Sequence, residues 1–358
     1  MLLHAIHLDD FRNYEHADCE FAPGLTAVLG ENGQGKTNLV EAIGYLATLS
    51  SMRGAPTDAL VRAGAERAII RATGVRDGRE LLIEAELGGR RPKVQINRQP
   101  LKRTRDLLGA LRVVVFSPDD LALIKEGPSH RRGYLDDLLV SVHRKYDAQR
   151  SAVDKTLRQR NALLRQTGGR LDSDAALTLE VWDQRFAEAG EALVAARVNL
   201  LDRLRPVLAA AYDDVASEPA HVGVDYVAPW RSSGLAEALL AARHDDLRRG
   251  VSTVGPHRDE ILLTIGAMSS RTHASQGEQR SLALAMRLAA HRVVTEVTGS
   301  APLLLLDDVF SELDPARSAA LLDHLPVAAQ TVLTSASGLP EGAQPERIID
   351  VVSGRLDP

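Results

Sequence analysis

Apolar and polar positions divide the chain into strand-like and helical stretches. An uncharged apolar run at 25–29 predicts a short buried strand, and Leu39, Ile43, Leu46 and Ala47 recur at helical spacing soon after it. A glycine-rich loop separates the two. We therefore predict a strand, a loop and an amphipathic helix in direct succession near the start of the chain.

Short β-like runs fill most of the remaining first third. Asp77-Gly78 and Gly88-Gly89 separate three of them, and such dipeptides are typical of tight hairpin turns. An antiparallel meander is the expected result. A continuous apolar run at 111–116 indicates a strand buried inside a sheet, and Ser117-Pro118 after it favours the start of a helix. The expected strands in this part lie at 2–8, 17–21, 67–75, 80–87, 93–96 and 111–116.

The middle of the chain has the period of a helix. We expect one helix over 129–166 and a second from about 174 to 215, separated by Gly168-Gly169. Two such helices predict an antiparallel hairpin, either as a short coiled-coil-like arm or packed within a helical lobe. Basic residues in this part are either a solvated face, which is the commoner case, or DNA contacts. They are His130, Arg131, Arg132, Arg144, Lys145, Arg158, Arg160 and Arg165.

Composition limits the class of protein. The 358 residues are 44% hydrophobic and 25% charged, as in globular proteins, and no apolar run is long enough for a transmembrane helix. The net charge of −5 excludes a uniformly basic nucleic-acid coat, so any DNA site must be a local or assembled patch. One cysteine, Cys19, excludes an internal disulfide and a cysteine zinc cluster. We expect a cytoplasmic protein without a signal peptide or membrane partner.

The loop from Gly30 to Thr37 matches the phosphate-loop pattern at every fixed position. Its glycines let backbone N–H groups approach phosphate oxygens, and the following helix N-terminus favours an anion. Lys36 would reach the β- and γ-phosphates and Thr37 would ligate Mg²⁺. A glycine-rich turn with an incidental lysine is the alternative, which the flanking strand and helix disfavour.

A second pair of candidate residues ends the apolar run at 303–306. Asp307 could hold Mg²⁺ and Asp308 could polarise the attacking water. Ser275 and Gly277 open another predicted helix, which is a weak anion-binding signal when taken alone. The 252–259 segment, with His257 and Arg258, could be an active-site loop or an ordinary one. Further strands are expected at 260–265, 303–306, 331–335 and 347–352.

In order along the chain, the phosphate loop, SQGEQR, LLLLDD and SELD resemble an ABC-type ATPase of the SMC-like chromosome-maintenance and repair branch. Within that branch the chain resembles the bacterial RecF family, from the FRNY segment to SQGEQRSLALAMRLA. The resemblance implies ATP-dependent binding at gaps and junctions between single- and double-stranded DNA, assistance to RecA loading with RecO and RecR, and an ATP-dependent head-to-tail homodimer. Ser275 would contact the γ-phosphate bound by the other subunit. The implied nucleotide-binding residues are Arg12, Gly30, Glu31, Asn32, Gly33, Gln34, Gly35, Lys36, Thr37, Asn38, Ser275 and Gly277.

Three departures from the wider ABC pattern concern details of the site. Asp308 replaces the usual glutamate, which suggests slow hydrolysis, and no Q-loop glutamine follows Phe116. Thr334 and Ser335 stand where a switch histidine is usual. An ABC-transporter subunit is the alternative function, disfavoured by the missing histidine and by the helical insertion. A P-loop kinase would leave SQGEQR and SELD unexplained.

The expected fold is α/β: a P-loop ABC-type ATPase head with a mixed sheet and an inserted α-helical lobe. We divide the chain into 1–116 with the phosphate loop, 117–250 as the helical lobe, and 251–358 with the signature-like segment and closing strands. Both chain ends should contribute to the sheet of the head. The preferred DNA structure, the DNA-contacting residues, the surface for RecR and the hydrolysis rate stay open.

Overall fold

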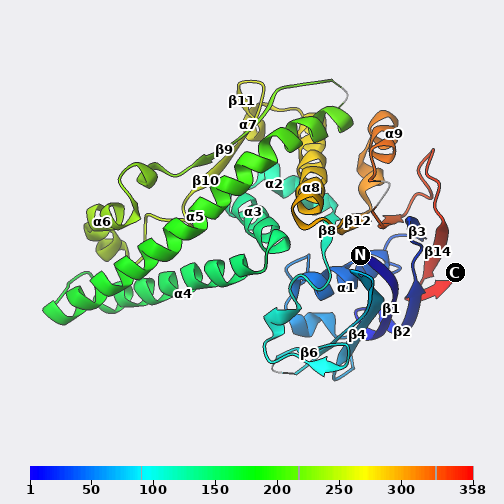
Figure 1. Ribbon diagram of the computed structural model, residues 1–358, viewed down its shortest axis with the longest axis horizontal. Coiled ribbons are helices and arrows are strands. Elements are labelled where there is room, and N and C mark those ends of the chain that lie inside the picture. The colour runs from blue at the N-terminus through cyan, green and yellow to red at the C-terminus, as the bar shows by residue number, and fades with distance from the viewer. Residues whose placement is uncertain (90, 217, 327–328, 358) are drawn as a thin grey trace. The chain divides into compact units, whose positions relative to one another are not determined.

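The computed structural model describes residues 1–89, 91–216, 218–326 and 329–357. The chain forms two compact units (Figure 1). The first contains 1–120, 210–219 and 280–358, and the second contains 121–209 and 220–279. Segment 251–279, which the sequence-based division grouped with the closing part of the head, thus clusters with the helical unit.

The phosphate-loop strand lies in the middle of a six-stranded sheet in the first unit. β3 (Leu25–Leu29) pairs in parallel with β13 (Thr331–Ser335) on one side and with β14 (Arg347–Val352) on the other. The sheet continues through β12 (Leu303–Asp307) to β8 (Val113–Phe116), and antiparallel β15 (Arg355–Asp357) closes the other edge. Sequence from both chain ends therefore surrounds the strand that leads into the loop.

A second sheet of the first unit is antiparallel. Its order is β2-β1-β4-β5-β6-β7, whereas sequence patterns had predicted a mixed sheet without separating the meander from it. The meander strands pair with one another and with the N-terminal hairpin, so they form their own layer. Asp77 and Gly78 have φ of 52° and 72°, which confirms the predicted tight turn. The bounds are β1 Leu2–Phe11, β2 Tyr14–Glu20, β4 Ala68–Arg76, β5 Arg79–Leu87, β6 Lys93–Ile96 and β7 Gln99–Pro100.

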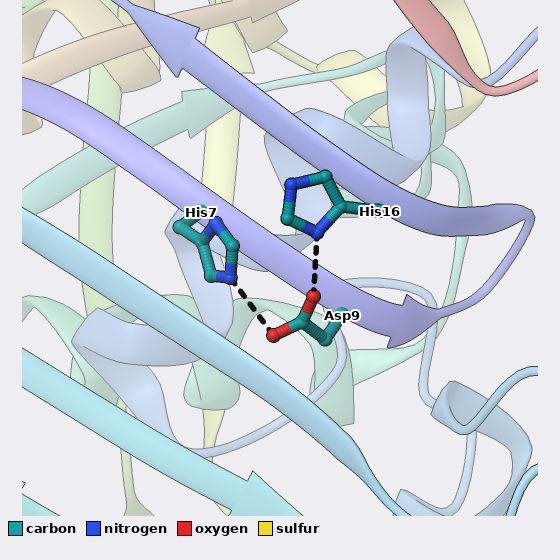
Figure 2. Close-up of side chains that lie close together, drawn as sticks. All are labelled: His7, Asp9 and His16. Carbon is teal, nitrogen blue, oxygen red and sulfur yellow. Dashed lines mark hydrogen bonds and ion pairs between the residues drawn. The ribbon is translucent and has the colours of Figure 1, made fainter.

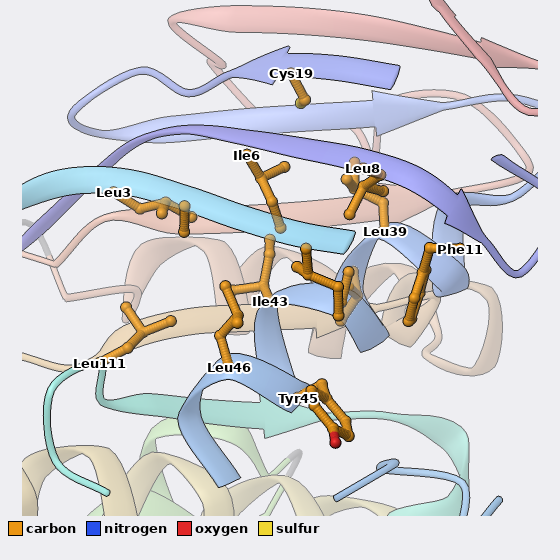
Figure 3. Packing of buried hydrophobic residues seen from close by; sticks show 14 of the residues in the cluster. Leu3, Ile6, Leu8, Phe11, Cys19, Leu39, Ile43, Tyr45, Leu46 and Leu111 are labelled. Atoms are coloured by element: carbon orange, nitrogen blue, oxygen red, sulfur yellow. The ribbon is translucent and has the colours of Figure 1, made fainter. Parts of the chain in front are cut away.

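Helix α1 (Lys36–Thr48) contributes to the core of the first unit. It contacts strands of both sheets, including β1 and β4 of one and β12 and β13 of the other. Leu39, Ile43 and Leu46 are fully buried, and Figure 3 shows them facing apolar side chains of β1. Because almost every side of this helix is covered, the position of its N-terminus at the phosphate loop is fixed by packing.

Two further helices complete the first unit. α8 (Gln276–Thr298) begins in the second unit and runs into the first, and α9 (Pro315–Asp323) follows β12. Asp314 caps α9 by accepting a hydrogen bond from the backbone N–H of Arg317 at 2.9 Å. Within the described residues, no helix combines the length and apolarity needed to cross a membrane. Single 3₁₀ turns lie at Thr57–Leu60, Thr104–Leu107, Pro118–Leu121 and Val309–Glu312.

The second unit is mostly helical. The single helix predicted over 129–166 is wrong, because α3 (Pro128–Val142) ends at His143 in extended conformation and α4 (Lys145–Gln166) begins two residues later. No glycine or proline marks this break, and the helical period of apolar residues continues through it. The sequence therefore contains no local sign that one helix ends here. α4 and α5 (Ser173–Val215) form the expected hairpin (Figure 1). The other elements are α2 Ala122–Lys125, α6 Leu235–Arg249, α7 Ser270–His273, the sheet of β9 Val222–Val227, β10 Glu260–Ile265 and β11 Met268–Ser269, and a 3₁₀ turn at Pro229–Ser232.

Buried ion pairs hold the helices of the second unit together. Arg160 of α4 is fully buried and donates hydrogen bonds to Asp183 at 2.7 Å, Asp246 at 2.6 Å and Ser252 at 2.8 Å. Arg131 is also buried and pairs with Glu260 at 3.0 Å. Two arginines from the predicted basic clusters are thus structural, because a buried guanidinium needs its partners and is not available to DNA.

Candidate nucleotide-binding site

Two glycines of the phosphate loop, Gly30 and Gly35, lie where a side chain would collide with backbone or with supporting residues. Gly30 has φ of 148°, and a Cβ there would lie 2.4 Å from the carbonyl oxygen of Val351. Gly35 has φ of 130°, and its Cβ would lie 2.8 Å from Asn13 Nδ2. Both positions require glycine for conformation and for space. Glycine at these positions therefore lets the loop backbone lie close to its surroundings, a packing that phosphate binding by backbone N–H groups needs.

The turn between β1 and β2 supports the loop from one side. Asn13 Nδ2 donates a hydrogen bond to the carbonyl of Gln34 at 2.7 Å, and its Oδ1 accepts one from Asn38 at 2.7 Å. The fully buried Tyr14 donates to the carbonyl of Gly35 at 2.9 Å. Sequence reasoning noted the FRNY segment only through Arg12 and missed these two supporting residues, for which an asparagine and a tyrosine in a hairpin turn give no clear signal.

Lys36 is held over the loop. The residue is buried, and its ammonium donates hydrogen bonds to the carbonyls of Gly30 at 2.8 Å and Glu31 at 2.9 Å. Burial lowers the pKa of Lys36 below its ordinary value, while the negative charges of Asp308 and Asp307 oppose that shift. The loop thus presents a cation close to two carboxylates, at the N-terminus of α1.

Asp307 and Thr37, far apart in sequence, meet at the carboxyl end of β12. Asp307 Oδ1 accepts hydrogen bonds from Thr37 Oγ1 at 3.0 Å and from Thr334 Oγ1 at 2.8 Å. Burial raises the pKa of the Asp307 carboxyl, and the two hydroxyl donors oppose the shift. A hydroxyl and a carboxylate are the hard oxygen ligands that Mg²⁺ prefers, so the residues fit that ion.

Asp308 has an unusual backbone conformation. Its φ of 51° and ψ of 28° lie in the left-handed region, which aspartate adopts more readily than most residues. Its backbone N–H donates to Thr334 Oγ1 at 2.9 Å. Its Oδ1 is buried and accepts no hydrogen bond from any residue that the structure describes, which suits an acceptor for a water.

Thr334 connects the two acids. Its hydroxyl accepts from the backbone of Asp308 and donates to the carboxylate of Asp307, because β12 and β13 pair with Asp307 opposite Thr334. The sequence identified Thr334 only as the residue in place of a switch histidine. Its contacts could not be foreseen without the strand register.

Other residues near the phosphate loop differ in their contacts and exposure. Arg12 forms a bidentate ion pair with Glu41 of α1, at 2.8 and 2.9 Å, so its predicted contact with a nucleotide stays a prediction. Glu31, Asn32 and Gly33 are exposed at the tip of the loop. Arg53, between α1 and β4, is exposed, and its positive charge opposes the rise in the pKa of Asp307 that burial causes.

Ser275 belongs to the second unit, unlike Lys36 and Asp307. Its backbone N–H donates to Glu278 at 2.7 Å and its Oγ accepts from the backbone N–H of Glu278 at 3.3 Å. This reciprocal pair is a capping box at the start of α8. Ser275 is exposed there, and Gly277 follows within the first turn of the helix.

The 252–259 loop is a structural element of the second unit. Asp259 is buried and accepts hydrogen bonds from Tyr226 and Trp230, both at 2.7 Å. Burial lowers the pKa of His257 to about 4, so this imidazole is neutral near pH 7. These contacts favour the interpretation as an ordinary supporting loop over an active-site loop.

Comparison with known proteins places these features in a family. Residues 2–338 match the model described as the RecF/RecN/SMC N terminal domain. The chain is 41% identical over 399 residues to the DNA replication and repair protein RecF of Arthrobacter sp. strain FB24, covering 100% of this chain and 99% of that protein. It is 43% identical over 391 residues to the protein of the same name from Nocardioides sp. strain JS614, covering 92% and 93%.

Solved structures agree. The chain matches the "Structure of the recombination mediator protein RecF-ATPrS in RecFOR pathway" with a TM-score of 0.91 and 30% identity, covering 99% of this chain and 97% of that one. The corresponding RecF-ATP structure matches with a TM-score of 0.90 and 31% identity, covering 99% and 96%. An Smc head bound to the C-winged helix domain of ScpA, at 18% identity and a TM-score of 0.60 over 100% and 96%, shares the fold alone. The chain is a member of the RecF family of ABC-type ATPases.

Proposed function

We propose that the protein is an ATPase whose nucleotide state controls its binding to DNA during replication and repair. The meeting of Lys36, Thr37 and Asp307 in one site carries the proposal. A phosphate loop alone would fit many functions, but a loop joined to this acid pair in a RecF-family chain favours ATP hydrolysis coupled to DNA repair.

Each residue of the site has a separate proposed role. Lys36 and the loop N–H groups bind the phosphates, with Gly30, Glu31, Asn32, Gly33, Gln34, Gly35 and Asn38 forming the binding segment. Thr37 and Asp307 would hold Mg²⁺, which supplies charge neutralisation at the phosphates when bound. Asp308 would accept a hydrogen bond from the attacking water through its unpartnered Oδ1. The short reach of an aspartate is consistent with slow turnover.

The relatives suggest the partners. The names of these relatives connect RecF with DNA replication and repair, and with ATP in the RecFOR pathway. We infer that this chain recognises gaps or junctions between single- and double-stranded DNA in the bacterial cytoplasm, and assists RecA loading together with RecR and RecO. The net charge of −5 argues that an isolated monomer binds DNA weakly and that two subunits combine local basic patches.

Mg·ATP should raise the affinity of the wild-type protein for gapped DNA, and gapped DNA should stimulate ATP hydrolysis. Because phosphate contacts release counterions, log affinity should fall linearly with log salt, with a slope of several units. Fluorescence anisotropy with gapped DNA at several salt concentrations, with and without ATP, measures both effects. Equal DNA affinity with and without ATP would contradict nucleotide control, whereas failure of ATP to bind at all would contradict the site itself.

Ser275 should complete the site of a second subunit. Ser275→Arg should bind ATP as a monomer but fail to dimerise, because a bulky cation replaces the exposed hydroxyl at the start of α8. Lys36→Ala should fail because its phosphate loop is defective. A mixture of the two variants should regain part of the ATPase activity, since a heterodimer contains one intact pair of Lys36 and Ser275.

The measurement is ATP hydrolysis across mixing ratios, with sedimentation to detect the heterodimer. Thr272→Arg is a matched control, because Thr272 is also exposed in the second unit but precedes the capping box. Normal dimerisation and hydrolysis by Ser275→Arg alone would disprove the shared site.

A further inference from the structure

A group of imidazole and carboxylate side chains lies on the outer face of the antiparallel sheet, among residues to which no role has been assigned above. His7 and Asp9 project from β1, and His16 and Asp18 project from β2. Alternation along the strands explains the placement, because neighbouring Ile6, Leu8, Ala17 and Cys19 are buried on the opposite face. The strand register sets Asp9 opposite His16 and His7 opposite Asp18.

The four side chains form a closed ring of contacts. One carboxylate oxygen of Asp9 lies 2.8 Å from His7 Nε2, and the other lies 2.8 Å from His16 Nδ1 (Figure 2). The remaining ring nitrogens both contact Asp18, with His7 Nδ1 at 2.8 Å and His16 Nε2 at 3.2 Å. Each imidazole thus has one nitrogen toward Asp9 and the other toward Asp18.

We propose that His7 Nε2, His16 Nδ1 and the Asp9 carboxylate bind a divalent transition-metal ion of the Zn²⁺ class. Ligand atoms of these three residues lie within 4.8 Å of one another. Zinc bonds of about 2.0–2.1 Å require ligand atoms roughly 3.3–3.4 Å apart in a tetrahedron. The two 2.8 Å contacts, each to a different oxygen of Asp9, would therefore open by about half an ångström, and the ligand atoms farthest apart, which lie within 4.8 Å of one another, would move closer.

Asp18 has the position of a supporting carboxylate. Histidines that bind a metal commonly donate their other ring N–H to a carboxylate, which fixes the tautomer and orients the ring. Here one carboxylate serves both imidazoles. Two histidines and one carboxylate leave a fourth position of a tetrahedral ion for water or another ligand.

Charge and access also favour a cation. A bound metal displaces protons from its histidine ligands, so two carboxylates would then balance the charge of a divalent ion. The side chains of His16 and Asp18 are 61% and 70% exposed, which gives an entry path. Arg71 lies across β1–β4 from His7, but its guanidinium pairs with Glu84 at 2.7 Å. Hard Mg²⁺ prefers an all-oxygen shell, so this site should not take the ion that the phosphate loop needs.

The test uses full-length protein without nucleotide, titrated with Zn²⁺ in competition with a chromophoric chelator, in the presence of excess Mg²⁺. Wild type should bind one Zn²⁺ at this site and unfold at a higher temperature with it. Asp18→Asn should weaken binding by about 10- to 100-fold, as losses of supporting carboxylates do. His16→Gln should weaken it further, because it removes a ligand.

His4→Gln is the matched control, because His4 is exposed on the same strand and lies outside the ring. This variant should bind Zn²⁺ like wild type. Tetrahedral absorption of bound Co²⁺, present in wild type and His4→Gln and lost in His16→Gln, would support the ligand set. Equal Zn²⁺ affinity in His16→Gln and wild type, or no binding by wild type, would overturn the proposal. Because His16 is exposed, His16→Gln should not prevent folding. Thermal unfolding of this variant without metal checks that directly.

Discussion

Lys36→Ala should lose most of its affinity for ATP and essentially all hydrolysis. The ammonium donates to the Gly30 and Glu31 carbonyls and lies close to the charges of Asp307 and Asp308, and alanine places no cation at that position. A hydrogen bond to a charged group contributes about 1.5–3 kcal/mol, which corresponds to roughly a 10- to 100-fold loss in affinity. Isothermal titration with ATP and Mg²⁺ measures the affinity, and phosphate release measures the rate.

Lys36→Arg is the matched control for charge. It keeps a cation but not the compact ammonium, so it should impair hydrolysis more than binding. Both variants should retain the fold, because α1 is held by its apolar contacts with the two sheets. Normal turnover by Lys36→Ala would exclude the phosphate loop as the site of hydrolysis.

Asp308→Asn should bind Mg·ATP but hydrolyse it about 10²- to 10⁴-fold more slowly, since a positioned base contributes that much. Asparagine tolerates the left-handed backbone at this position as aspartate does, so the substitution changes the acceptor without adding strain. The ATP-bound form should accumulate, which single-turnover kinetics and sedimentation with ATP would detect.

Asp307→Asn distinguishes the role of Asp307 from that of Asp308. It removes charge from the carboxylate that Thr37 and Thr334 contact, so it should raise the Mg²⁺ concentration needed for binding and hydrolysis. Asp308→Asn should leave that requirement unchanged. Unchanged hydrolysis in Asp308→Asn would assign the base to another residue.

The site residues that could be predicted from sequence are those with a local signal. Gly30 to Thr37 have a fixed spacing, with a strand before them and a helix after them, and Asp307 ends an apolar run. Each of these signals can be recognised from neighbouring residues alone. The antiparallel turn at Asp77-Gly78 is local in the same sense. Family resemblance added Ser275, which its sequence context alone identified only as a helix start.

The residues that were missed depend on contacts between distant strands. Thr334 gains its role from the parallel register of β12 and β13, and Tyr14 from the approach of a hairpin turn to Gly35. The break at His143 was missed because apolar residues recur at helical spacing on both sides of it. That spacing alone does not distinguish one long helix from two consecutive helices. Arg160 was read as a possible DNA contact because charge in a sequence does not reveal burial.

The position of β3 has a consequence for synthesis of the protein on the ribosome. Its two sheet neighbours, β13 and β14, are made about 300 residues later. At about 5–20 residues per second, the phosphate-loop strand waits roughly 15 to 60 s with both edges unpaired. The β1–β2 and β4–β5 hairpins can form during that time, because their partners are close in sequence. A nascent chain halted before Thr331 should therefore expose an apolar strand that chaperones can recognise, and nucleotide binding should arise only after β13 and β14 have been made.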